Sequence, residues 1–192
     1  MAEIGVWRGE FAERMLDACP DIEAYYLVDP WRNLDDWNKP LNYSDLEAAL
    51  EETRSRLAKH KNRCIYLRGT TTEVADQLPQ LDFAYIDGDH TLRGITLDLL
   101  RIWPKIREGG AVGGDDFSPT IWQHKRKYEP TMVFPFAVHF AEGVGRPITA
   151  LPNKQFLLEN SGSFHFSDPS GQYADTEIGT QLRSPLARKI FG

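Results

Sequence analysis

Short apolar runs alternate with helical patterns along the first 116 residues of the chain. Runs typical of buried strands occur at residues 2–5, 25–28, 64–67, 83–86 and 111–112. Between these runs, apolar residues recur every three or four positions, most clearly in residues 92–102, and this is the spacing of an amphipathic helix. Strands that alternate with helices predict an α/β fold in which the helices cover a parallel sheet.

The pattern loosens after residue 116. We expect a helix from Pro135 to Gly143, followed by strands at 148–151 and 155–158, whose short connection favours an antiparallel pair. Beyond Phe166 the chain is rich in Ser, Gly, Asp and Pro. The sequence therefore predicts one domain over residues 1–166 and a polar tail over 167–192, with a short C-terminal helix at its end.

The first expected strand lies unusually close to residue 1. A doubly wound domain normally has a segment that covers this part of its sheet. We therefore expect either that the domain lacks an N-terminal segment or that a partner subunit covers the edge, which makes a homo-oligomer an open alternative.

The composition of the chain indicates which classes of partner to expect. The 22 basic and 28 acidic residues give a net charge of −6, which argues against a nucleic-acid partner. No apolar stretch has the length of a membrane span, and charged residues interrupt the N-terminal segment where a signal peptide would be apolar. Cys19 and Cys64 lie far apart in sequence and are expected to be reduced thiols. We therefore expect a cytoplasmic protein with no membrane partner.

Acidic residues follow two of the expected strands. Asp87 and Asp89 come after the strand at 83–86, and Asp115 and Asp116 come after the strand at 111–112. The carboxyl ends of parallel strands meet at the edge of the sheet where ligands bind, so we expect the four carboxylates to converge. Crowded like charges are costly unless a cation lies among them or a pKa rises.

A cofactor site is expected after the first strand. Gly5 and Gly9 permit a tight strand-to-helix turn, and Asp29 ends the second strand, where a carboxylate can accept hydrogen bonds from ribose hydroxyls. A dinucleotide-binding loop needs a further glycine at the position that Trp7 occupies. The pattern therefore favours a nucleoside cofactor without a pyrophosphate over NAD or FAD.

These motifs resemble those of the class I S-adenosylmethionine (SAM)-dependent methyltransferases over roughly residues 2–160. Glu3, Gly5 and Gly9 are similar to the first motif of that family, and Asp29 to its acidic ribose position. The segment Gly69-Thr70 is similar to the turn after the third strand. The resemblance implies a Rossmann-like, doubly wound sheet of seven strands, mostly parallel with an antiparallel last strand.

Within that family, the acidic clusters resemble those of metal-dependent O-methyltransferases of the catechol and macrolide-sugar types. The resemblance implies that Asp87, Asp115 and Asp116 bind a divalent cation, with Mg²⁺ expected because hard cations prefer carboxylate oxygens. It places Asp89 at the position of a general base. His90 is the competing base, because the pKa of an imidazole lies near neutrality.

The predicted function is SAM-dependent transfer of a methyl group to a hydroxyl of a small molecule. The residues expected at the cofactor are Glu3, Gly5, Gly9, Asp29, Trp31, Gly69, Thr70 and Asp87. Trp31 is included because an aromatic side chain on a loop at the ligand edge can line an adenine or acceptor pocket.

Several alternatives stay open at this point. The glycines can serve the turn alone, Trp31 can belong to a small satellite core, and Asp89 or the Asp115-Asp116 pair can cap helices. Methyl transfer can proceed without a metal, or the domain can be a non-catalytic methyltransferase-like binding module.

Overall fold

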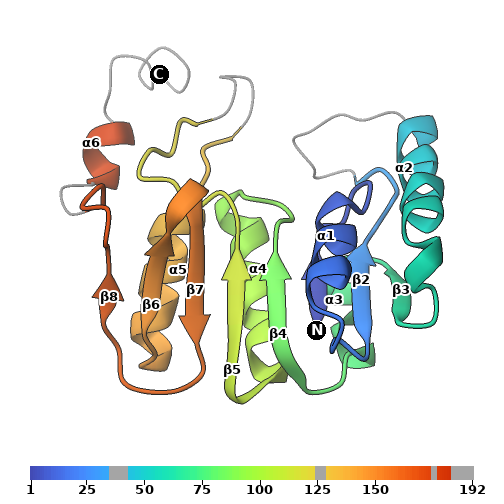
Figure 1. Ribbon diagram of the computed structural model, residues 1–192. Helices are drawn as coiled ribbons and strands as arrows, with labels where there is room; N and C mark the ends of the chain where they lie inside the picture. Colours follow the sequence, from blue (N-terminus) through green and yellow to red (C-terminus); the bar gives the residue numbers. More distant parts are fainter. Residues whose placement is uncertain (35–42, 124–128, 174–176, 183–192) are drawn as a thin grey trace.

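The described residues form one mixed sheet of eight strands in the computed structural model, which describes residues 1–34, 43–123, 129–173 and 177–182 (Figure 1). The strands are β1 (Ala2–Ile4), β2 (Tyr25–Asp29), β3 (Cys64–Arg68), β4 (Leu81–Ile86), β5 (Ile106–Gly114), β6 (Ile148–Leu151), β7 (Gln155–Glu159) and β8 (Phe166–Ser167). Their order across the sheet is β3-β2-β1-β4-β5-β7-β6-β8.

Strand pairing confirms the predicted doubly wound sheet. β1 pairs in parallel with both β2 and β4, and the parallel part extends to β3 and β5. β7 lies antiparallel between β5 and β6, as the short connection between the last two predicted strands indicates. β8 pairs in parallel with β6 and adds an eighth strand to the seven that were expected.

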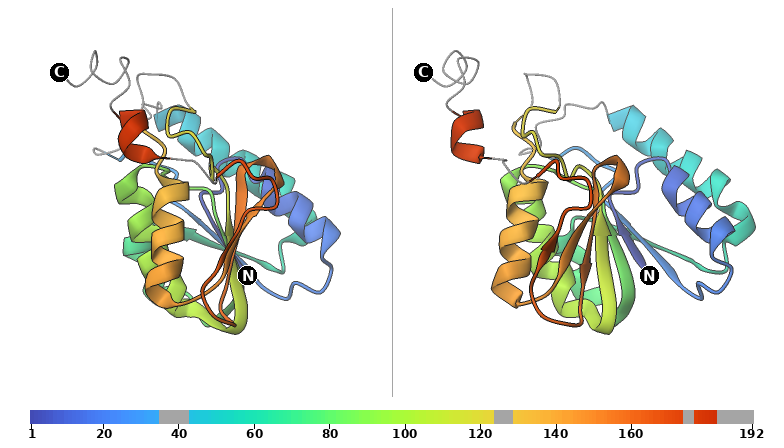
Figure 2. Two further views of the ribbon diagram at one scale, coloured as in Figure 1. Left: turned by 90° about the vertical axis from the view of Figure 1, so that its left-hand side faces the viewer. Right: turned by 60° about the vertical axis from the view of Figure 1, so that its left-hand side comes forward.

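Helices cover both faces of this sheet (Figure 2). One face carries α1 (Glu10–Ala18) and α2 (Tyr43–Arg56), and the other carries α3 (Thr71–Val74), α4 (Leu92–Ile102) and α5 (Val133–Val144). A final helix is α6 (Ile178–Leu182), and single 3₁₀ turns lie at Ala58–His60, Ala75–Gln77, Trp103–Lys105 and Pro152–Lys154. None of the helices in the described part of the chain has the length and apolar content to cross a membrane.

Each face of the sheet has its own hydrophobic core, because successive side chains of a strand point to opposite faces. The core under α3, α4 and α5 contains Ile4 of β1 together with Ile95, Leu99 and Ile102 of α4. The core under α1 and α2 contains Leu16 and Leu27. In β1, Ala2 and Ile4 join the first core, whereas Glu3 points to the face that α1 and α2 cover.

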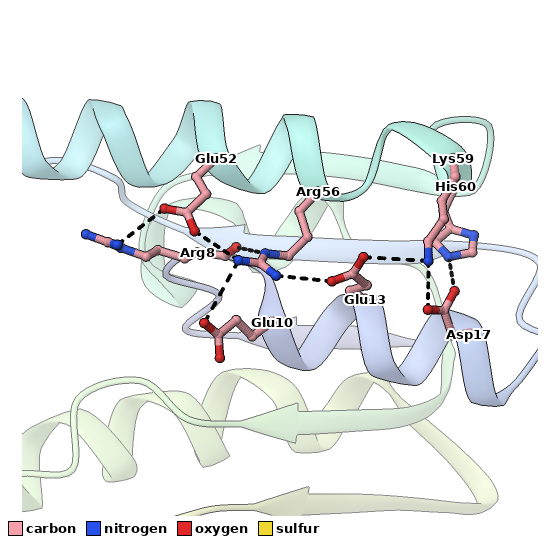
Figure 3. Close-up of polar contacts among 8 residues, drawn as sticks. All are labelled: Arg8, Glu10, Glu13, Asp17, Glu52, Arg56, Lys59 and His60. Atoms are coloured by element: carbon pink, nitrogen blue, oxygen red, sulfur yellow. Dashed lines mark hydrogen bonds and ion pairs between the residues drawn. The ribbon is translucent and has the colours of Figure 1, made fainter.

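A row of charged residues lies between α1 and α2 (Figure 3). Arg56 of α2 contacts Glu13 of α1 at 3.2 Å and Glu52 at 2.9 Å, and Lys59 contacts Asp17 at 2.7 Å. Exposed ion pairs contribute little to stability individually. The alternating signs of these charges instead favour one relative placement of α1 and α2. The row lies next to the loop that joins β1 to α1.

The chain beyond residue 166 packs against the domain. Tyr173 is buried in the core of the α5 face, and its hydroxyl donates a hydrogen bond to the carbonyl of Phe117. In α6, the Gln181 side chain accepts a hydrogen bond from the Ile121 N–H and donates one to the Pro119 carbonyl, both at 2.8 Å. The expected C-terminal helix, in residues 184–192, lies outside the described residues.

Candidate functional site

A pocket of about 660 Å³ lies at the carboxyl ends of β1, β2, β3 and β4. Its walls come from the loops that follow these strands and from the first turns of α4, and they include Gly5, Asp29, Gly69, Thr70 and Asp87. These are five of the eight residues that the sequence assigns to the cofactor. The volume is within the range of small-molecule sites, which is roughly 300–1,000 Å³.

The loop between β1 and α1 depends on two glycines with left-handed backbone. Gly5 has a φ of 85°, and a Cβ there would lie 2.2 Å from the carbonyl oxygen of Asp87. Gly9 has a φ of 74° and is the N-cap of α1, where a Cβ would meet the Thr53 side chain at 2.8 Å. Gly5 therefore lets this loop touch the acidic segment after β4. Gly9 lies behind the pocket and is not among its lining residues.

Asp29 organises the backbone of the same loop. Its Oδ2 accepts hydrogen bonds from the Val6 and Trp7 N–H groups at 3.0 and 2.9 Å, and its Oδ1 accepts one from the Trp31 N–H at 2.7 Å. Burial raises the pKa of this carboxyl, and the three backbone donors oppose the rise. Each carboxylate oxygen has two lone pairs, so Oδ1 keeps an acceptor position beside the pocket.

Trp31 supports the loop from behind. Its side chain is fully buried in the core under α1 and α2, and its Nε1 donates a hydrogen bond to the Trp7 carbonyl at 2.8 Å. The Thr53 hydroxyl of α2 lies 2.9 Å from the same carbonyl and 2.8 Å from the Ala49 carbonyl, and it shares its one proton between them. Trp31 is not a lining residue of the pocket, because the core takes up its ring. Sequence reasoning did not assign Thr53 to the site.

Thr70 and Glu73 close the pocket at the end of β3. They form a capping box at the start of α3, in which the Glu73 carboxylate accepts a hydrogen bond from the Thr70 N–H at 2.8 Å. The other Glu73 oxygen accepts one from Arg32 at 2.5 Å. These contacts lower the pKa of Glu73 and join the segment after β2 to the segment after β3.

Glu3 lies away from the pocket. Its side chain is 2% exposed, and its carboxylate accepts a hydrogen bond from the Tyr25 hydroxyl at 2.6 Å. Burial, together with the negative charges of Asp87 and Asp29, raises its pKa to about 8. In this structure Glu3 is therefore a core residue beneath the loop that joins β1 to α1, and it is not part of the pocket wall.

The predicted catalytic and metal-binding residues converge on a second hollow of about 10 Å³ beside the pocket. Its lining includes Asp87, Asp89, His90, Asp115 and Asp116. Asp87, Gly88 and Asp89 line both cavities, so this segment is the wall that they share. A ligand in the large pocket would therefore lie directly beside the acidic cluster.

Asp89 and His90 have different surroundings. Both oxygens of Asp89 accept hydrogen bonds from Thr91, the N-cap of α4, at 3.0 and 2.9 Å. His90 is buried, and its Nδ1 lies 3.1 Å from Oδ2 of Asp116. Asp89 therefore contacts the N-cap of α4 and is not itself the cap, and His90 forms a pair with a carboxylate.

Asp115 and Asp116 are held by contacts of their own. Oδ1 of Asp115 accepts a hydrogen bond from the Asp116 N–H at 2.8 Å, and Oδ1 of Asp116 accepts one from Gln123 at 2.6 Å. Burial raises the pKa of Asp115. Across the described residues, no three His, Cys, Asp or Glu side chains lie at the spacing that a metal ion requires. The donors are of the chemical type that a divalent cation prefers.

Asp98 also lines the large pocket and was not assigned from the sequence. The available signal was its spacing, because a residue three positions after Ile95 and four before Ile102 falls on the apolar face of α4. A carboxylate on such a face is unusual and requires a partner.

A family of known proteins matches the part of the chain that carries the candidate site. Residues 2–117 match a family model described as a methyltransferase domain, and these residues contain the loop that joins β1 to α1 and both acidic clusters. No curated protein sequence matches the chain significantly.

Solved structures of methyltransferases share the fold. One is a protein from Staphylococcus aureus, provisionally assigned as a caffeoyl-CoA O-methyltransferase. Its TM-score is 0.63 at 15% identity, over 84% of this chain and 75% of that chain. Another is the O-methyltransferase TomG from Streptomyces achromogenes in complex with SAM, with a TM-score of 0.59 at 13% identity, over 83% and 72% of the two chains.

A third similar structure is the methyltransferase PaMTH1 from Podospora anserina with bound S-adenosylhomocysteine (SAH). Its TM-score is 0.59 at 12% identity, over 84% of this chain and 71% of that chain. At these identities the structural likeness establishes the fold, and the family model establishes the family. The chain therefore belongs to the methyltransferase-domain family and has the fold of the class I SAM-dependent methyltransferases.

Proposed function

We propose that this protein transfers the methyl group of SAM to a hydroxyl of a small molecule. The observation that carries the proposal is the wall formed by Asp87, Gly88 and Asp89, which separates a nucleoside-sized pocket from a cluster of acidic side chains. Methyl transfer to oxygen needs this juxtaposition, because the group that accepts the hydroxyl proton must lie beside the methyl donor. The O-methyltransferases among the similar folds support oxygen as the acceptor atom.

The residues of the large pocket fit SAM. Gly5 lines the pocket and lets the loop after β1 contact the backbone after β4, Asp29 retains an acceptor position for a ribose hydroxyl, and Thr70 lines the pocket at the end of β3. When bound, SAM supplies a methyl group already activated by its sulfonium. The work left to the protein is to orient the acceptor hydroxyl and to remove its proton.

Asp89 is the proposed base. Its carboxylate borders both cavities, and the two hydrogen bonds from Thr91 fix its orientation without using all of its lone pairs. The proton of the acceptor hydroxyl would pass to this carboxylate as the oxygen takes the methyl group.

His90 is the second candidate base, and its contact with Asp116 is the observation that favours it. A carboxylate at 3.1 Å stabilises the imidazolium that forms when the ring accepts a proton. His90 lines the small hollow only, whereas Asp89 also borders the large pocket. Replacing each residue in turn, as D89N and H90Q, separates the two assignments, because only loss of the base should lower kcat by about 100-fold or more.

Divalent-metal assistance stays part of the prediction, and no chemical step is assigned to it. The carboxylates of Asp87, Asp115 and Asp116 around one hollow support it, whereas the contact between Asp116 and His90 favours methyl transfer without a metal.

Calorimetric titration of the purified protein with SAH, in Mg²⁺ and then in EDTA, tests the cofactor assignment first. We expect micromolar binding. Heat that depends on Mg²⁺ would support the metal. Failure of the folded protein to bind SAH would overturn the methyltransferase function and favour a non-catalytic binding module.

Two glycine variants provide the matched control. In Gly5→Ala, the new Cβ would clash with the backbone of Asp87 and force a strained φ, so SAH binding should be lost. In Gly143→Ala, no atom lies within 4 Å of the new Cβ, and SAH binding should equal that of the wild type. Equal binding by both variants would contradict the pocket assignment.

A further inference from the structure

Asp116 has a strained backbone at the edge of the acidic hollow. Its φ is 57°, in the left-handed region that residues other than glycine rarely adopt. Such a conformation persists only where the surrounding structure fixes it, and strained residues of this kind cluster at functional sites. The contacts of the Asp116 side chain therefore indicate what the strained backbone serves.

Both oxygens of the Asp116 carboxylate have a neighbour. Oδ1 accepts a hydrogen bond of 2.6 Å from Nε2 of Gln123, and Oδ2 lies 3.1 Å from Nδ1 of His90. The His90 side chain is 2% exposed. A carboxylate beside Nδ1 favours the neutral ring form in which Nδ1 carries the proton and Nε2 keeps its lone pair. Nε2 is then the nitrogen that can accept a further proton.

Lys154 determines which end of the Gln123 amide faces Asp116. Its ammonium donates a hydrogen bond of 3.2 Å to Oε1 of Gln123. The amide therefore has a cation at its oxygen, which only accepts, and a carboxylate at its nitrogen, which only donates. The reversed amide would place oxygen against the carboxylate and nitrogen against the ammonium. The four groups thus form a row in the order ammonium, amide, carboxylate and imidazole.

Backbone hydrogen bonds connect the segments that carry this row. The Phe117 N–H donates to the Lys154 carbonyl at 2.8 Å, and the Met132 N–H donates to the His90 carbonyl at 2.9 Å. Lys154 has a φ of 60° and lies in the turn between β6 and β7. The loops after β4 and β5 and the turn between β6 and β7 therefore meet beside the acidic hollow.

We propose that Gln123 is a positioning residue that holds Asp116 against His90, and that Lys154 orients the Gln123 amide for this task. The row fixes the imidazole with Nδ1 toward Asp116 and keeps Nε2 as a proton acceptor. This role rests on the proposed function, in which His90 is the second candidate base.

The test reads the tautomer of His90 by ¹⁵N NMR, which distinguishes a ring nitrogen that carries a proton from one that does not. Spectra are recorded in alkaline buffer, where an imidazole is neutral, and in EDTA, so that no divalent cation competes for Asp116. The His90 signals are identified by their absence from the spectrum of His90→Gln. In the wild type we expect the proton on Nδ1.

Gln123→Leu removes the donor that holds Oδ1 of Asp116. The ratio of the Nδ1–H form to the Nε2–H form of His90 should fall by about threefold to tenfold, which corresponds to the loss of one hydrogen bond. SAH binding, measured by calorimetry, should equal that of the wild type, because Gln123 does not line the large pocket.

The Lys154 variants test the orientation of the amide. Lys154→Met removes the ammonium and keeps an unbranched side chain, so the tautomer ratio should fall in the same direction. Lys154→Arg keeps a cation at Oε1 of Gln123 and should retain the wild-type ratio. Gln80→Leu is the matched control. Gln80 is exposed just before β4, at the opposite end of the sheet, and donates to the Pro104 carbonyl, so its loss should leave the His90 tautomer unchanged.

Several results would overturn the inference. A wild-type ring with its proton on Nε2 means that Asp116 does not set the tautomer. A wild-type ratio in a folded Gln123→Leu variant means that Gln123 only packs in its loop. Equal shifts in Gln123→Leu and Gln80→Leu mean that the effect is not local. Should thermal unfolding show that Gln123→Leu does not fold, equal ratios in Lys154→Met and Lys154→Arg would overturn the role instead.

The proposed function fails by a different observation. A folded wild type that does not bind SAH overturns methyl transfer, and calorimetry reports this without reference to His90. The tautomer of His90 is measured without cofactor or acceptor, so it tests the row of contacts separately from the reaction.

Discussion

The Glu3 carboxyl illustrates, at the scale of a residue, how the core can take up a side chain from a cofactor motif. It lies under the loop that it was expected to serve, with Tyr25 as its partner and no cation beside it in the described structure. Ionisation of a buried carboxyl is costly, so its pKa is raised to about 8, far above that of an exposed glutamate. The protonated form is therefore the stable one in the folded protein at neutral pH.

Stability should consequently fall as the pH rises through neutrality. The unfolded state loses the Glu3 proton near the ordinary pKa of 4.5, whereas the folded state keeps it up to about 8. The contribution is complete at low pH and is lost toward pH 8, at up to about 1.4 kcal/mol per pH unit. Glu3→Gln keeps an acceptor for Tyr25 and removes this slope. Thermal unfolding of the wild type and of Glu3→Gln between about pH 5 and pH 8 measures this slope. The same pH dependence of stability in both proteins would contradict the raised pKa of Glu3.

At the scale of elements, α2 supports the loop that joins β1 to α1. Thr53 is fully buried, its hydroxyl lies 2.9 Å from the Trp7 carbonyl, and its methyl group lies against Gly9. Trp7 has a φ of 53°, a backbone conformation that side chains other than glycine rarely adopt. The contact with α2 supports this strained residue, and the charged row lies between α1 and α2 (Figure 3).

Replacement of Thr53 by valine tests this support, since the two side chains have nearly the same shape. We expect a loss of about 1–2 kcal/mol in the free energy of unfolding, because the variant lacks the hydroxyl that donates to Trp7. SAH should also bind more weakly. Thr96→Val is the control, since that hydroxyl donates only within α4, to the Leu92 carbonyl. Urea unfolding and calorimetry measure both effects, and equal values for the two variants would count against a role for α2.

At the scale of the whole molecule, the segment after residue 166 completes the core on the α5 face. The Tyr173 ring lies 4.8 Å from that of Phe134 and 5.2 Å from that of Phe117, measured between ring centroids. Phe117 follows directly after Asp116. The far end of the described chain therefore packs against the loop that carries part of the acidic cluster. The predicted boundary between a domain ending at residue 166 and a polar tail stays a prediction. Tyr173, which follows that boundary, packs against residues that precede it.

Tyr173→Ala should lower the free energy of unfolding by about 3–5 kcal/mol, as other large aromatic truncations in cores do. Tyr173→Phe keeps the ring and should cost about 1 kcal/mol for the missing hydroxyl. Phe164→Ala, at a position that is 37% exposed, should change little. Denaturant unfolding compares the three variants. A Tyr173→Ala variant as stable as Phe164→Ala would mean that this segment does not belong to the folded core.

Up to β7, the local sequence pattern predicts the order and type of the strands and main helices, and the edge of the sheet that carries the candidate site. Periodicity identified the strands and helices, and the acidic residues after β4 and β5 marked the ligand edge, because strand ends are visible locally. Gly5, Asp29, Gly69, Thr70 and Asp87 were placed at the pocket by the same reasoning, and the structure finds all five in its walls.

The partners of individual side chains become visible only in the folded molecule. Glu3 meets Tyr25, Trp31 meets Trp7, and Asp98 meets Thr71, each across more than 20 residues of sequence. Asp116 lies beside His90 and not within a group of three metal ligands among the described residues. These outcomes depend on packing between segments that are distant in the chain. A local pattern reveals the face or the strand end on which a residue lies, but not the neighbour that it meets there.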